Sequence, residues 1–237
     1  MKATKIMAMH QANYIPWLGY FYKMAKCDVF VYLDVVQYPR GRSFAARNKI
    51  KTPNGSAFLT VPVSLPKGRE GKALYTEVQF ANDQWKEKHK KTLQFNYKKA
   101  PFFDEIFSLY VQQVDRSRNL LKLNLNLIEA VADYLNIRTK RVRLSEILKQ
   151  FGQKTDLIID ICKAVVADGY LSGTGGGKEY NDEAKLAQNG ITLMYSDFKH
   201  PEYRQLYGPF EKYLSILDLL FNEGPHSREI LLKKNGN

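Results

Sequence analysis

Short apolar runs alternate with amphipathic stretches along most of the chain, a pattern typical of α/β proteins. The first run, 5–9, predicts a buried strand, and 28–34 predicts a second strand that is rich in β-branched and aromatic residues. Between them, 17–26 predicts a helix, and Pro16 stands at its first turn, where a missing N–H costs nothing. Strand, helix and strand within about 30 residues make a βαβ unit, so the two strands should run parallel.

The middle of the chain changes from strand signals to helix signals. The sequence Pro53-Asn54-Gly55 is a turn signal between 48–51 and 57–63, which predicts a β-hairpin. Helical periodicity follows, and Pro101 interrupts it. We expect three helices in this section, over 83–97, 102–114 and 117–135.

The last third of the chain returns to alternating strands and helices. Strands are predicted at 142–144, 169–172 and 191–195. Helices are predicted at 156–167 with Thr155 as the cap, at 181–188 with a stop at Gly190, and at 214–221 with a stop at Gly224-Pro225. The predicted fold class is therefore α/β, a Rossmann-like and mostly parallel sheet with a helical insertion and a β-hairpin. We expect a single domain over 1–237, in which a helical lobe can occupy about 83–152.

The charge balance narrows the choice of partners. The chain has 237 residues, and 36 Lys and Arg against 24 Asp and Glu give a net charge of +12. Such an excess attracts anions such as RNA, a nucleotide, a phospholipid headgroup or a sugar diphosphate, or it simply makes a basic surface. Cys27 and Cys162 lie in apolar runs and are expected to be buried thiols. Without a secretory segment or an apolar run of about 20 residues, the expected compartment is the cytoplasm.

A polar cluster, His10-Gln11-Ala12-Asn13-Tyr14, stands between the end of the first predicted strand and the start of the first helix. Parallel sheets bind ligands at that edge, and a helix N-terminus offers N–H groups to a phosphate or carboxylate. His10 can act there as an acid or base near neutral pH. The alternative is that His10 and Asn13 only cap the loop.

The same residues resemble the opening of a known family. The run His10-Gln11-x-x-Tyr14-x-Pro16-Trp17-x-Gly19-Tyr20-Phe21 resembles the opening motif of the WbqC-like proteins, with Ala12 where proline is expected. The likeness continues at positions that include Asp34, Gln37, Arg47, Asn48, Ser172, Gly173, Gly175, Gly176, Tyr180, Tyr203 and Gln205. It covers nearly the whole chain.

This resemblance implies an enzyme of O-antigen, lipopolysaccharide or related polysaccharide biosynthesis that transfers a glycyl, aminoacyl or other small acyl group to a sugar. The substrate would be an anionic small molecule such as a nucleotide sugar or a lipid-linked glycan. On this hypothesis the catalytic residues are His10, Asn13 and His200. The substrate-binding residues are Gln11, Tyr14, Trp17, Asp34, Gln37, Arg47, Asn48, Ser172, Gly173, Gly175, Gly176, Lys178, Tyr180, Tyr203 and Gln205.

A second resemblance is limited to the first βαβ unit. A strand, then His10-x-x-Asn13, a helix and a strand that begins at Asp28 are together similar to nucleotidyltransferases with an H-x-G-H or H-x-G-N motif. This likeness implies a nucleotidyltransferase-like fold that holds the phosphates of ATP, with magnesium as a companion ion and Asp34 as its candidate ligand. Ala12 stands where the glycine of that motif belongs, which argues against close approach of the backbone. The sequence has no cluster of Cys or His residues of the kind that predicts a tight metal site.

Other segments carry candidate chemistry of their own. The glycine-rich segment 172–178 can wrap an anion with its N–H groups, or serve only as a turn. The basic stretch 40–49 mixes arginines with aromatic residues, so it can grip a phosphate or form the solvated flank of the hairpin. His200 can pair with the opening motif, although a lone histidine in a loop is more often structural. His89 lies in a lysine-rich helix and is expected at the surface.

Three hypotheses remain open. The first is a small-group transferase, and the second is an ATP-dependent nucleotidyltransferase or adenylating enzyme. The third is a non-catalytic RNA-binding protein, favoured by the charge of +12 and the lysine-rich helix. A glycyl donor carried on tRNA would combine the first hypothesis with the third.

Overall fold

The computed structural model describes residues 4–39, 41–66, 72–175 and 181–233. The chain is divided between two compact units. The sheet unit comprises Met1–Gln11, Tyr22–Val35 and Arg138–Phe198, and the hairpin unit comprises Ala12–Phe21, Val36–Ile137 and Lys199–Asn237. The helical section expected over 83–152 thus belongs to the hairpin unit as far as Ile137 and to the sheet unit beyond it.

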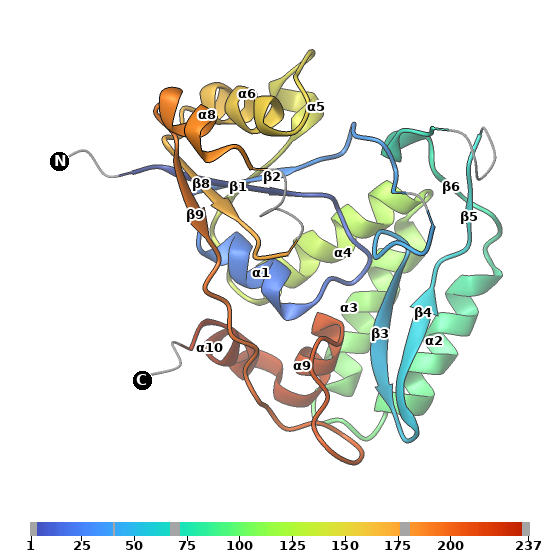
Figure 1. Ribbon diagram of the computed structural model, residues 1–237. Helices are drawn as coiled ribbons and strands as arrows, with labels where there is room; N and C mark the ends of the chain where they lie inside the picture. The colour runs from blue at the N-terminus through green and yellow to red at the C-terminus, as the bar shows by residue number, and fades with distance from the viewer. Residues whose placement is uncertain (1–3, 40, 67–71, 176–180, 234–237) are drawn as a thin grey trace. The chain divides into compact units, whose positions relative to one another are not determined.

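Five parallel strands form the sheet unit (Figure 1). They are β1 (Ile6–His10), β2 (Val29–Tyr32), β7 (Lys140–Arg143), β8 (Gly169–Ser172) and β9 (Thr192–Tyr195). The order across the sheet is β7-β2-β1-β8-β9, and every neighbouring pair is parallel. All four residues of β2 are buried, as an apolar run in a parallel sheet predicts. The predicted parallel βαβ unit is confirmed.

The strand order reverses direction at β1. The chain first steps outward from β1 to β2 and β7, and it then returns to the other side of β1 to add β8 and β9. Open α/β sheets bind their ligands outside the carboxyl ends of the strands at such a switch point. This arrangement confirms the Rossmann-like α/β fold and singles out the edge between β1 and β8.

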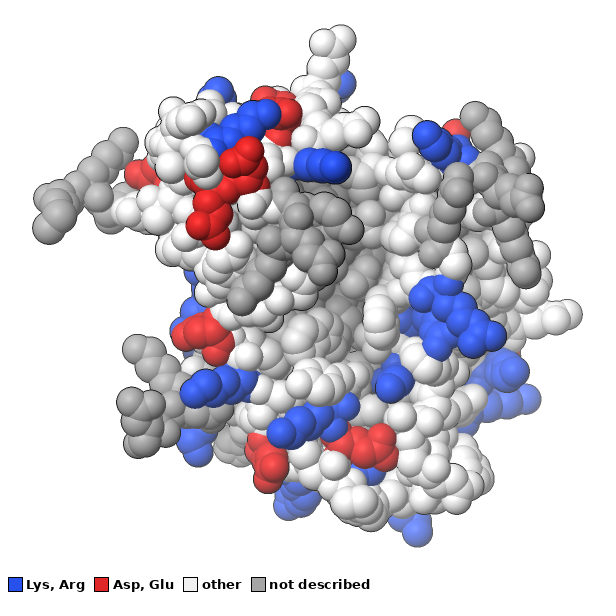
Figure 2. All heavy atoms as spheres, viewed as in Figure 1, with Lys and Arg blue, Asp and Glu red and all other residues white. Residues whose placement is uncertain are grey.

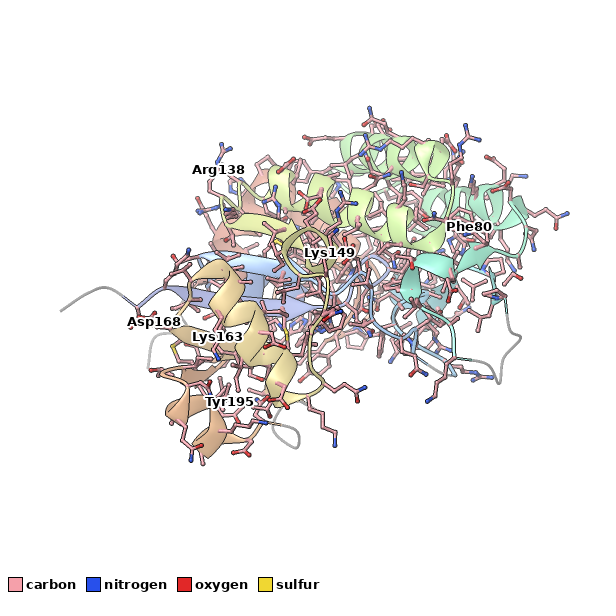
Figure 3. The ribbon with its side chains drawn as sticks, turned by 90° about the horizontal axis from the view of Figure 1, so that it is seen from above. Phe80, Arg138, Lys149, Lys163, Asp168 and Tyr195 are labelled. Carbon is pink, nitrogen blue, oxygen red and sulfur yellow. The ribbon has the colours of Figure 1, made fainter. Side chains whose placement is uncertain are left out.

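Helices lie on both faces of this sheet. They are α1 (Leu18–Ala25), α5 (Leu144–Ile147), α6 (Thr155–Val165) and α8 (Glu183–Gln188). Figure 1 shows α6 and α8 on one face and α1 on the other. Figure 3 looks onto the α6 layer, with Lys163 marking α6 and Tyr195 marking the end of β9. The expected cap Thr155 is instead the first residue of α6, and its hydroxyl accepts a hydrogen bond from the Asp182 N–H at 3.1 Å.

The hairpin unit contains the predicted β-hairpin. Its strands are β3 (Arg47–Thr52) and β4 (Gly55–Thr60), which pair antiparallel with Thr52 opposite Gly55. Gly55 has a φ of +96°, a conformation that favours glycine, and it closes the two-residue turn. A second short pair, β5 (Val63–Ser64) and β6 (Gln79–Phe80), lies farther along the chain, with the 3-10 turn η1 (Tyr75–Glu77) before β6.

Helices make up the rest of the hairpin unit. They are α2 (Gln84–Tyr97), α3 (Phe103–Arg116), α4 (Leu120–Tyr134), α9 (Ile216–Glu223), the 3-10 turn η2 (Gly224–His226) and α10 (Ser227–Leu232). Phe221 on α9 is fully buried, and its ring stacks on that of Tyr97 with centroids 4.5 Å apart. Gly224 ends α9 with a φ of +49°, and a Cβ there would lie 2.3 Å from the Phe102 ring. Of the described helices, none is both long and apolar enough to cross a membrane.

Candidate functional site at the sheet edge

The switch point separates two strands that diverge toward their carboxyl ends. β1 and β8 pair over Ile6–Met7 and Gly169–Tyr170, and each strand then continues outside this ladder, to His10 and Ser172 respectively. Strands that part at a switch point leave room for a ligand between their ends. His10 and Ser172 therefore lie at the rim of the candidate site.

His10 is half-buried at the end of β1. Its Nδ1 lies 3.0 Å from the Gln11 carbonyl oxygen, which makes Nδ1 the donor and gives Nε2 the lone pair in the neutral ring. Burial of the ring, and then the positive charge of Lys23, lower the pKa of His10 to about 3. Around neutral pH the imidazole is thus uncharged and suited to accepting a proton or a hydrogen bond.

Lys23 is the site residue that the sequence analysis missed. It lies on α1, is 6% exposed, and donates from Nζ to the Met9 carbonyl oxygen at 3.0 Å. Burial lowers the pKa of Lys23 to about 8. The sequence did indicate a buried lysine, because α1 is apolar on all sides and offers no solvent-facing stripe to which Lys23 could belong.

Asp34 follows β2 and ties two elements together. It is 3% exposed, and its two carboxylate oxygens accept from Ser145 of α5, from the N–H at 3.0 Å and from Oγ at 2.6 Å. The described residues contain no group of three or more His, Cys, Asp or Glu placed to hold a metal ion. The two hydrogen bonds from Ser145 to Asp34 fix the position of α5 beside the strand ends.

The start of the glycine-rich segment is open. Ser172 is buried, and its Oγ accepts from the Asn181 amide at 3.1 Å. A Cβ built at Gly173 or Gly175 would meet no atom within 4 Å, and neither glycine has the positive φ that demands glycine. Neither packing nor backbone conformation explains these two glycines, of which Gly173 is half-buried and Gly175 is exposed. The predicted site residues Gly176, Lys178 and Tyr180 lie outside the described residues.

Comparison with known proteins identifies the family. The model of the WbqC-like protein family matches residues 11–230. This chain belongs to the WbqC-like protein family. It is also 35% identical over 232 residues to "Uncharacterized protein Rv1507c" of Mycobacterium tuberculosis (strain ATCC 25618 / H37Rv), a match that covers 96% of this chain and 97% of that protein. No solved structure matches the chain.

Tyr14 of the WbqC-like opening motif and Asn48 of β3 hold the loop around Ile15. Tyr14 is fully buried in the hairpin unit, and its hydroxyl lies 2.6 Å from the Tyr110 hydroxyl and 2.9 Å from Nδ1 of His89. Asn48 donates from its amide to the Ile15 carbonyl at 2.8 Å. Ile15 itself has a φ of +35°, which a β-branched residue adopts only under strain. These contacts fix a strained loop.

The placement of His89 corrects an expectation. The lysine-rich surroundings suggested an exposed side chain, but His89 is 3% exposed, and its Nε2 lies 3.1 Å from the Thr60 carbonyl.

Asn13 and Trp17 are half-buried, and the Trp17 ring covers Gly19 so closely that a Cβ there would lie 2.4 Å from it. The ring of Tyr213 lies 5.7 Å from that of Trp17.

Tyr203 and Gln205 of the WbqC-like pattern belong to a buried polar network. The Tyr203 hydroxyl donates to one carboxylate oxygen of Asp218 at 2.9 Å, and the Tyr97 hydroxyl donates to the other at 2.8 Å. The Gln205 side-chain oxygen accepts from Nζ of Lys51 at 2.8 Å. Burial raises the pKa of Asp218 to about 6, although the hydrogen bonds and the charge of Lys51 oppose the rise.

Three further predicted site residues, His200, Gln37 and Arg47, lie in the hairpin unit and make different kinds of contact. His200 has both ring nitrogens engaged, with Nδ1 2.9 Å from the Pro201 carbonyl and Nε2 accepting from the Tyr213 N–H at 3.1 Å. This pattern fixes a loop. Gln37 is exposed at a single bridge with Leu74. The Arg47 guanidinium lies 3.3 Å above the centre of the Phe58 ring.

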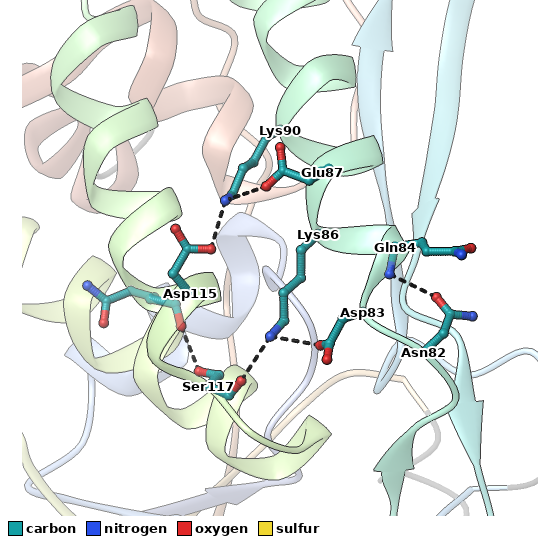
Figure 4. Close-up of polar contacts among 9 residues, drawn as sticks. Asn82, Asp83, Gln84, Lys86, Glu87, Lys90, Asp115 and Ser117 are labelled. Atoms are coloured by element: carbon teal, nitrogen blue, oxygen red, sulfur yellow. Dashed lines mark hydrogen bonds and ion pairs between the residues drawn. The ribbon is translucent and has the colours of Figure 1, made fainter.

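Two lysines of α2 are engaged in ion pairs (Figure 4). Lys86 pairs with Asp83 at 2.8 Å, and Lys90 pairs with Glu87 at 2.8 Å and with Asp115 of α3 at 2.7 Å. The Lys90–Asp115 pair joins α2 to α3, and the three pairs together neutralise part of the basic character of α2. Four exposed lysines stay on α2 or just after it: Lys88, Lys91, Lys98 and Lys99.

Proposed function

We propose that this WbqC-like protein is a small-group transferase, which moves a glycyl, aminoacyl or acyl group onto a nucleotide sugar or lipid-linked glycan during synthesis of surface polysaccharide such as O-antigen. The observation that carries the proposal is the switch point, where His10 and the open glycines Gly173 and Gly175 stand at the ends of two diverging strands. That edge is where parallel sheets bind phosphate-bearing ligands.

The phosphate of the substrate binds between the two strand ends. Backbone N–H groups at Gly173 and Gly175 donate to its oxygens, and neither glycine has an atom within 4 Å of its Cβ position that would crowd the ligand. The buried ammonium of Lys23 adds a positive charge in surroundings of low dielectric, where it acts more strongly than in water. Together they attract and orient an anion.

His10 removes a proton from the acceptor. In the transfer step an acceptor hydroxyl or amine attacks the carbonyl carbon of the activated group, a new bond forms there, and the bond to the leaving group breaks. The acceptor proton passes to Nε2 of His10, while Nδ1 stays bonded to the Gln11 carbonyl. A bound phosphate offsets the charge of Lys23 and so raises the pKa of His10, which makes the ring a stronger base when substrate is present.

The test measures product formation in the wild type and in two variants. The purified protein is incubated with nucleotide sugars and with glycine supplied as glycyl-tRNA, and mass spectrometry detects a sugar that has gained a glycyl group. His10→Ala should abolish the product, and a Tyr134→Phe variant, altered on α4 of the hairpin unit, should retain it. Undiminished product in His10→Ala would refute the role of His10. An absence of product with every donor and acceptor would refute the transferase.

A second candidate, an adenylating enzyme, is favoured by the strand order, which is that of nucleotide-binding sheets. It ranks second because the Ala12 carbonyl is held by the Tyr75 hydroxyl and by the Asn124 amide, which keeps this stretch of backbone engaged within the protein. Exchange of labelled pyrophosphate into ATP that depends on both glycine and His10 would move it to first place. A well-folded protein without exchange would leave the transferase with a pre-activated donor.

A further inference from the structure

A cleft in the hairpin unit combines two arginines with hydroxyl groups. Its volume is about 1110 Å³, and it lies where β4 ends and β5 begins. Arg42 and Arg47 line it, and so do the side chains of Ser43, Thr60 and Ser64. Figure 2 shows Lys and Arg side chains gathered over the β3–β4 hairpin.

The two arginines lack acidic partners. In the described part of the chain, no Asp or Glu forms an ion pair with Arg42 or Arg47. The contrast is with α2, where Lys86 and Lys90 are each matched by a carboxylate. Two unmatched cations that line one cleft give it a positive potential, which favours the binding of an anion.

Arg47 is held ready for such an anion. It stands opposite Thr60 in the hairpin register, so its side chain shares a face with Phe58, which is 41% exposed. Stacking of the guanidinium on this ring restricts its rotation but leaves its N–H edge able to donate. Less side-chain entropy is then lost when a phosphate is bound.

Small buried side chains form part of the lining of the cleft. Ala46, Val61 and Ala73 line it, each 7% exposed or less, and Tyr38 lines it as well. Small residues leave space for the body of a ligand. The combination of a paired positive charge, hydroxyl groups and an apolar floor fits a small organic phosphate.

We propose that this cleft is a binding site for the phosphate or diphosphate group of a small substrate, with Arg42 and Arg47 as its paired donors. The proposal goes beyond the function proposed above and does not depend on it, because it concerns residues of the hairpin unit alone. Arginine pairs bind phosphate through two parallel hydrogen bonds each, which a lysine cannot imitate.

The test is calorimetric titration of the full-length protein with inorganic pyrophosphate at low ionic strength. Arg42→Ala and Arg47→Ala should each weaken binding by about ten-fold or more, since a charged hydrogen bond is lost. Arg47→Lys, which keeps the charge, should weaken it as well. The matched control is Arg118→Ala, an exposed arginine of the same unit, which should bind as the wild type does. Circular dichroism confirms that each variant is folded.

Competition experiments distinguish a nucleotide from a lipid-linked compound as the source of the phosphate. Displacement of bound pyrophosphate by UDP supports a nucleotide ligand, and displacement by a short prenyl diphosphate supports a lipid-linked one. The proposal is overturned if the double variant of Arg42 and Arg47 binds pyrophosphate as tightly as the wild type. It is overturned as well if the double variant still binds pyrophosphate and His10→Ala does not. It is also overturned if Arg118→Ala weakens binding equally, or if only single-stranded RNA binds.

Discussion

Tyr97→Phe isolates a single hydroxyl in the buried network of the hairpin unit. That hydroxyl donates to Asp218 at 2.8 Å and accepts from the backbone N–H of Lys51 at 2.8 Å. Phenylalanine keeps the ring that stacks on Phe221, so packing is preserved while two buried polar groups lose a partner. Each group left unsatisfied costs about 1–3 kcal/mol, so we expect the variant to lose about 2–6 kcal/mol of stability near neutral pH.

The loss should depend on pH. In the folded wild type the pKa of Asp218 is raised from 3.8 to about 6, so the folded state binds the proton more tightly than the unfolded state does. Asp218 therefore stabilises the fold most below about pH 4, and this contribution declines by about 3 kcal/mol as the pH rises through 6. Removing one donor raises the pKa of Asp218 further, so Tyr97→Phe should cost more at pH 8 than at pH 5.

Urea unfolding followed by circular dichroism at pH 5 and pH 8 measures both effects. Tyr134→Phe is the control, because its hydroxyl contacts Glu105 at 3.2 Å at a partly exposed position, and its loss should cost about 0.5 kcal/mol or less. Equal stability of Tyr97→Phe and wild type at pH 8 would contradict the assigned hydrogen bonds. A cost that is the same at both pH values would contradict the coupling to Asp218.

Two further predictions concern other parts of the chain. Gly224→Ala should lower stability by about 2 kcal/mol or more, because Gly224 has a positive φ and a Cβ there would contact Phe102. Thermal unfolding measures the loss, and Gly190→Ala is the control, because Gly190 has a positive φ but open space around it and should lose less stability. A larger loss in Gly190→Ala than in Gly224→Ala would disprove the packing argument. Lys23→Met should raise the pKa of His10 toward its usual value without reaching it, because a positive charge is removed while burial persists; an NMR titration that shows no change would disprove the electrostatic link.

Local patterns predicted most elements of the fold. The turn signal 53–55 set the register of β3 and β4, and the apolar runs at 5–9 and 28–34 became β1 and β2. Short elements such as β5 and β6 were missed, since two-residue strands carry no periodicity. The strand order was also beyond local reasoning, because it depends on which edge of β1 pairs with a strand some 160 residues later.

The site was harder to predict than the fold. His10 was found because it follows an apolar strand, but Lys23 was overlooked because a lysine near a helix end usually reaches solvent. The exposure of His89 was judged from its lysine neighbours, whereas the spacing of Trp85, His89, Leu93 and Tyr97 at four-residue steps indicates a buried stripe. The roles proposed for the site residues stay predictions until the variants are measured.

Each unit of this chain is assembled from three separate segments. During synthesis β1 leaves the ribosome early, yet its partner β8 follows only after the whole of α2, α3 and α4. The sheet cannot close until then, and α9, which supplies Phe221 and Asp218, comes later still. Contacts between such distant segments slow folding. A contiguous fragment that holds one complete unit also carries part of the other, so expression of truncated pieces should yield chains that aggregate or are degraded.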